Sequence, residues 1–148
     1  MVSIQDFAQN MDWWGLITLL VSAVAALACI TLHELSHGFV AWRLGDSTAK
    51  QAGRLTLNPI RHLDVVGLVM MVVAKVGWAK PVPVDMRYFK RPRLDMAITA
   101  LAGPAANFLT AFLAVLGSSL IYHFAPFAQW ALLLQCLLSN LALLGIGM

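Results

Sequence analysis

Long apolar stretches frame one polar stretch along the chain. Within residues 13–42 the only formally charged residue is Glu34, and after Asp95 the chain has no Asp, Glu, Lys or Arg. About 20 consecutive apolar residues are enough to form a helix across a bilayer. The pattern therefore predicts three spanning helices, the last two an antiparallel pair, over residues 13–43, 95–122 and 126–148.

The stretch between the first two predicted spans has no single periodicity. Residues 54–57, RLTL, alternate as a short strand does, while Pro81 and Pro83 leave residues 80–85 only extended or edge-strand conformations. Residues 65–74 are uncharged but too few to span, which predicts a re-entrant or interfacial segment. The predicted fold class is an all-α integral membrane protein with about three transmembrane helices, this short segment and small strand elements.

Composition and charge agree with a membrane protein and orient it. The 148 residues are 60% hydrophobic and 11% charged, and all ten Lys and Arg residues lie between Arg43 and Arg93. The positive-inside rule then predicts that residues 43–95, with the small strands, are cytoplasmic and that the N-terminus is outside. No basic stripe is interleaved with aromatic residues, as it is in nucleic-acid binders. We therefore expect the chain to contact the lipid bilayer and not nucleic acid.

The first predicted span carries the sequence HELSH. His33 and His37 are four residues apart and share one helical face. Two imidazoles at this spacing can bind one Zn²⁺, and Glu34 can act as general base on a water that the metal activates. A charged side chain at mid-bilayer costs about 2.5–3.5 kcal/mol on insertion scales. This cost favours metal chemistry over the alternative, a polar contact between helices.

The next predicted span carries a second pair of interest, in the sequence GPAAN. Gly103 permits close helix approach, and Asn107, on the same face, offers an amide that can bind a substrate backbone or a developing oxyanion. The alternative is that both residues only join helices. Residues 80–85, KPVPVD, also have two interpretations: an edge that aligns a substrate by strand addition, or a connector that its prolines keep from aggregating.

Together these motifs resemble one known family. HELSHG, GRLTLNPIRHLD, GWAKPVPVD and AGPAAN occur in the order of the site-2 protease family of intramembrane zinc metalloproteases, in the compact prokaryotic branch without an inserted PDZ domain. The resemblance covers about residues 25–148. It implies that His33 and His37 are zinc ligands, that Glu34 is the catalytic base, and that Gly103 and Asn107 lie near the active site. It also implies a prokaryotic cell membrane and substrates that are transmembrane or membrane-anchored proteins.

The chain departs from the family at the third zinc ligand. A catalytic zinc generally takes three protein ligands, and the resemblance assigns the third to the Asp of an LDG sequence, which does not occur in these 148 residues. We therefore expect residues 1–148 to be a single membrane-embedded metalloprotease core that lacks its C-terminal part. The other candidates for the third ligand are all predicted to lie outside the membrane core: His62, Asp64, Asp85 and Asp95.

The predicted function is that of an intramembrane zinc endopeptidase, which hydrolyses peptide bonds in membrane-spanning or membrane-proximal protein segments. We expect activity from the full-length protein and little or none from these 148 residues alone. The alternative is a non-catalytic membrane protein that binds transmembrane partners, which the missing third ligand favours. A metal transporter fits less well, because no inverted repeat is visible.

Overall fold

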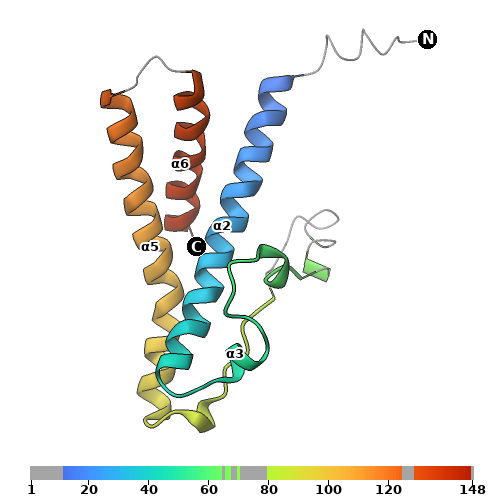
Figure 1. The fold of residues 1–148 in the computed structure, drawn as a ribbon, viewed down its shortest axis with the longest axis vertical. Helices are drawn as coiled ribbons and strands as arrows, with labels where there is room; N and C mark the ends of the chain where they lie inside the picture. The colour runs from blue at the N-terminus through green and yellow to red at the C-terminus, as the bar shows by residue number, and fades with distance from the viewer. Residues whose placement is uncertain (1–11, 65, 68–69, 71–79, 125–128, 148) are drawn as a thin grey trace, which may run out of the picture.

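Three long helices pack together in the computed structural model, which describes residues 12–64, 66–67, 70, 80–124 and 129–147. They are α2 (Trp13–Arg43), α5 (Pro92–Phe124) and α6 (Gln129–Gly147), and each contacts the other two. The described part of the connection from α2 to α5 includes three short helical turns: α3 (Thr48–Gln51), η1 (Pro59–Arg61) and η2 (Met86–Tyr88). Figure 1 shows these turns gathered beside the half of α2 that leads into the connection.

Helix α2 has the bounds that the sequence predicts because both of its ends carry local signals. At the start, the N–H of Gly15 donates to the side chain of Asp12 at 2.9 Å, which satisfies an N–H that the helix itself cannot pair. At the end, Gly45 has a φ of 115°, a conformation that glycine adopts without strain. The N–H of Asp46 then donates to the carbonyl of Ala41 at 2.9 Å, which turns the chain back.

Helix α5 begins earlier than predicted, at Pro92 instead of Asp95. Proline suits the first turn of a helix because that N–H has no intrahelical partner. The carboxylate of Asp95 accepts the N–H of Arg91 at 2.9 Å and so caps the helix start. Pro104 lies inside α5 without ending it.

The outer surface of the bundle is apolar, as a lipid-facing surface is. By length and composition α2 and α5 can each cross a membrane. Most of their large apolar side chains are exposed, as Leu19, Leu101 and Phe108 are, each by about two-thirds of its surface. The fold is thus mostly helical with two candidate spans, and the third predicted span, at α6, stays a prediction.

The predicted small strands are not formed in the described part of the connection. Residues 55–57 form bends, and side chains hold this stretch: Arg54 donates to the carbonyl of Arg61, and His62 Nε2 donates to the carbonyl of Thr56 at 2.9 Å. Residues 80–85 have neither helix nor strand. The predicted re-entrant segment at 65–74 lies largely outside the described residues.

Candidate metal and proton-transfer site

The two histidines of HELSH lie side by side on the face of α2 that meets α5. The ring centroids of His33 and His37 are 4.7 Å apart, with an angle of 81° between the ring planes. This arrangement follows from the four-residue spacing, which places them one turn apart on one face.

Helix α5 holds the Nδ1 atom of each ring. Nδ1 of His37 lies 2.7 Å from the backbone carbonyl oxygen of Thr99. A carbonyl only accepts, so Nδ1 carries the proton and Nε2 of the neutral ring keeps its lone pair. Nδ1 of His33 lies 3.0 Å from the side-chain amide of Asn107.

The two Nε2 atoms converge on the space beside Gly103. A Cβ built on Gly103 would lie 2.4 Å from Nε2 of His37 and 2.5 Å from Nε2 of His33. Zinc binds imidazole nitrogen at about 2.0–2.1 Å, so a point close to both nitrogens is open only because residue 103 has no side chain. The two histidines therefore fit a zinc ion as ligands.

Glu34, between the histidines, meets the connection instead of α5. Its Oε2 accepts the backbone N–H of Val82 at 3.1 Å. Gly38, one turn further along α2, lets this segment approach, since a Cβ there would lie 3.1 Å from Val82 Cγ1 and 3.2 Å from Ala49 Cβ. Residues 80–85 thus pass directly beside the HELSH motif and hold its carboxylate.

No third metal ligand joins the two histidines within the described ranges, where no group of three His, Cys, Asp or Glu side chains could hold a metal. His62 is fully buried and bonded to the Thr56 carbonyl, which makes its role structural.

The three aspartates proposed as alternatives also have other partners. Asp64 accepts the N–H of Val66 at 2.8 Å, and Asp95 accepts that of Arg91. Asp85 forms hydrogen bonds with Arg87, which lower the pKa of the Asp85 carboxyl below its usual value. The described residues therefore supply two of the three protein ligands that a catalytic zinc takes.

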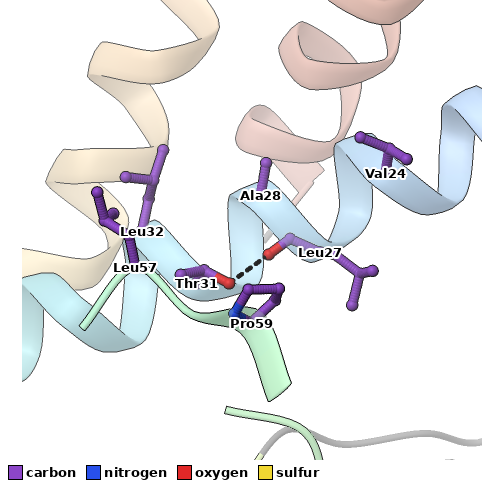
Figure 2. Close-up of a pocket in the computed structure, with 7 residues that line it drawn as sticks. All are labelled: Val24, Leu27, Ala28, Thr31, Leu32, Leu57 and Pro59. Carbon is purple, nitrogen blue, oxygen red and sulfur yellow. Dashed lines mark hydrogen bonds between the residues drawn. The ribbon is translucent and has the colours of Figure 1, made fainter. Parts of the chain in front are cut away.

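An apolar cavity of about 440 Å³ opens between α2 and the residues around η1. Figure 2 shows its lining, in which the only hydrogen bond drawn joins Thr31 Oγ1 to the carbonyl of Leu27 on the same helix. Leu32, which directly precedes His33, belongs to the lining, so the cavity adjoins the histidine turn. The residues that form it are Val24, Leu27, Ala28, Thr31, Leu32, Leu57 and Pro59.

Three contacts of this site were not anticipated from the sequence. Two come from the backbone, the carbonyl of Thr99 and the N–H of Val82, and the third is that of the Asn107 amide with His33. Thr99 lies four residues before Gly103 and eight before Asn107, so helical spacing places it on the same face. No comparable signal marks Val82. The roles predicted for Gly103 and Asn107 toward a substrate stay predictions, because their contacts here are with the two imidazoles.

Comparisons with known proteins agree on one family. The family described as "Peptidase family M50" matches residues 21–141. The chain is 50% identical over 90 residues to "Putative zinc metalloprotease YwhC" of Bacillus subtilis (strain 168), covering 61% of this chain and 41% of that protein. It is 32% identical over 112 residues to "Putative zinc metalloprotease Rip2" of Mycolicibacterium smegmatis, covering 73% and 42%. The chain spans less than half the length of these relatives. No solved structure matches it significantly.

Proposed function

The chain belongs to peptidase family M50, the site-2 protease family, and from this premise we propose that it carries the core of an intramembrane zinc endopeptidase. One observation supports the proposal above the others: both Nε2 atoms of the HELSH histidines point to the same space beside Gly103. His33 and His37 would hold the zinc ion through these atoms. The active protein needs one further protein ligand from outside the described residues.

Glu34 is the group that moves the proton in this proposal. A zinc ion, when bound, supplies a Lewis acid that brings the pKa of water to about 7. Glu34 accepts the proton from the attacking water and delivers it to the leaving amine. The N–H of Val82, donating to Oε2 of Glu34, holds the carboxylate in place for this transfer.

The proposed substrates are membrane-spanning or membrane-proximal protein segments. The apolar cavity next to Leu32 offers a place for an apolar side chain beside the histidine turn. Residues 80–85 pass the site without forming helix or strand, and an extended segment of this kind can pair with an unwound substrate.

The test of the proton-transfer role replaces one oxygen by nitrogen, in Glu34→Gln. In the full-length protein we expect cleavage of a membrane-spanning substrate to fall by at least about 100-fold, with zinc content unchanged. Ser36→Ala is the matched control: among the described residues, the hydroxyl of Ser36 on the same helix bonds only to the carbonyl of Leu32, so the cleavage rate of this variant should equal that of the wild type. Undiminished cleavage by Glu34→Gln would exclude Glu34 as the base.

The second candidate function is that of a non-catalytic membrane protein that binds transmembrane partners. The observation that favours it is the lack of a third His, Cys, Asp or Glu at the site among the described residues. The two candidates separate in one assay: the wild type with zinc either cleaves a membrane-spanning substrate or binds it and leaves it intact.

A further inference from the structure

The side chain of Asn107 is fully buried, and its two polar atoms have different surroundings. Its Nδ2 lies 3.0 Å from Nδ1 of His33. Its Oδ1 is buried and has no hydrogen-bond partner among the described residues. A buried amide oxygen without a partner is energetically unfavourable, so this arrangement calls for a physical reason.

The chemistry of the neighbouring imidazole supplies one. If Nε2 of His33 keeps its lone pair for a metal, the proton of the neutral ring is on Nδ1. Nδ1–H and the amide nitrogen are then both donors, and two donors do not bond. Turning the amide by 180° about its last bond exchanges oxygen and nitrogen at almost the same positions. Oδ1 then accepts from Nδ1–H and the donor–donor contact disappears, while the NH₂ group takes the buried position that Oδ1 leaves.

We propose that Asn107 is a positioning residue, whose Oδ1 accepts the Nδ1–H of His33 and thereby fixes the tautomer that directs the Nε2 lone pair to the space beside Gly103. This inference rests on the proposed function and extends it. It gives His33 the same support that the Thr99 carbonyl gives His37. In both cases an oxygen on α5 binds Nδ1 of an imidazole on α2, and the partner on the far side of a ligand histidine sets its ring orientation.

The position of Asn107 in the bundle agrees with this role. A Cβ on Gly145 of α6 would lie 2.7 Å from the backbone oxygen of Asn107, so α6 packs closely against this turn of α5. Packing from one side and full burial hold the amide against the ring of His33.

The first experiment measures zinc affinity by competition with a chelator, in the purified chain and its variants. Asn107→Leu has a similar volume but no acceptor, and we expect its affinity to fall about 10–100-fold. Asn107→Asp keeps an acceptor oxygen, so zinc affinity should be retained. Asn140→Leu is the control: Asn140 is a second helix amide, half-buried, that accepts from Ser22 at 2.9 Å, and its loss should leave zinc affinity unchanged.

The second experiment needs no metal. In zinc-free protein with ¹⁵N-labelled imidazoles, at a pH where the rings are neutral, the ring-nitrogen shifts report which nitrogen carries the proton. We expect Nδ1–H for His33 in the wild type and a shift toward Nε2–H in Asn107→Leu. A wild-type His33 protonated on Nε2 would overturn the inference whatever the zinc affinity is.

The outcomes separate this inference from the function on which it rests. The expected tautomer without zinc binding would count against the metal site and leave the contact between Asn107 and His33 in place. Zinc affinity unchanged in Asn107→Leu, with cleavage lost when the same substitution is made in the full-length protein, would assign Asn107 to the substrate and overturn its positioning role.

Discussion

At Gly103 a missing side chain decides what α2 and α5 can hold between them. Nε2 of both histidines approaches the place where a Cβ would be, and α5 could not lie this close to α2 with a larger residue there. Gly117, on the same helix, is different: its nearest neighbour would be a methyl group of Leu138 at 3.3 Å, a side-chain tip that can move.

The substitution Gly103→Ala therefore tests the site at its narrowest point. The added methyl group would occupy the space to which both Nε2 atoms point, so we expect zinc binding to be lost. Gly117→Ala is the matched control. It should bind zinc as the wild type does, because the added methyl group would meet Leu138 and not the histidines. It should also fold, because alanine favours a helix by about 0.5–1 kcal/mol over glycine. Equal zinc affinity in the two variants would place the metal elsewhere.

Residue spacing predicted the members of the site better than their contacts. Helical spacing predicted that His33 and His37 share a face, and their rings do lie side by side. Spacing also put Asn107 on one face with Gly103, but the contact of its amide with His33 was not predicted, since spacing gives a face and not the partner on it. The contribution of Val82 was not predictable, because every residue except proline has the N–H that it uses.

At the scale of elements, the residues through which α5 packs against the other helices recur every four positions. Asp95, Thr99, Gly103, Asn107 and Ala111 are all buried, and small or polar residues at such spacing let membrane helices approach closely. The bounds of α2 were predictable because Asp12 and Gly45 mark its ends. The predicted strand at 54–57 is not formed, because Arg54 and His62 donate to carbonyls of the connection. The alternation of apolar and polar residues does not reveal these bonds.

The connection is tied to α2 and to itself through Asp46, which is fully buried. Its Oδ1 accepts the N–H of Thr48 at 2.9 Å, and its Oδ2 accepts the N–H of Asp85 at 2.7 Å. The second bond fixes the end of the segment that carries Val82. Asp46 therefore helps to position Glu34 from a distance.

Asp46→Asn should weaken this tie, because one carboxylate oxygen becomes an NH₂ group that cannot accept. We expect the free energy of unfolding in micelles to fall by about 1–3 kcal/mol, measured by thermal or denaturant titration. Ser47→Ala, which removes a hydroxyl that accepts from the exposed Gln51 side chain, should change it by less than about 0.5 kcal/mol. A similar loss in both variants would refute a special role for Asp46.

For the whole molecule, large apolar side chains lie outside and small or polar ones inside. Ala25, Ala111 and Asn107 are buried, whereas Phe108 and Phe112 are more than half exposed. Apolar runs in the sequence predicted such a molecule but not the order in which the helices pack, because lipid-facing and helix-facing positions in these runs are both apolar. The positive-inside rule adds an orientation that can be tested directly.

Single cysteines test this orientation, in a background with Cys29 and Cys136 replaced by alanine. With an outside N-terminus, a membrane-impermeant maleimide should label Asn10→Cys in intact cells. Lys50→Cys should react only after permeabilisation, because residues 43–95 are proposed to be cytoplasmic. The reverse labelling pattern would invert the proposed topology.

The bonds from α5 to the two imidazoles also bear on the order in which the chain is made and assembled. Thr99 and Asn107 reach His37 and His33 from a helix that follows some fifty residues later in the chain. A newly made first span enters the bilayer with HELSH complete but without these oxygens, and its imidazoles are free to rotate. Because these oxygens arrive only with the later span, we expect the two imidazoles of a nascent chain to keep this freedom until synthesis has passed α5.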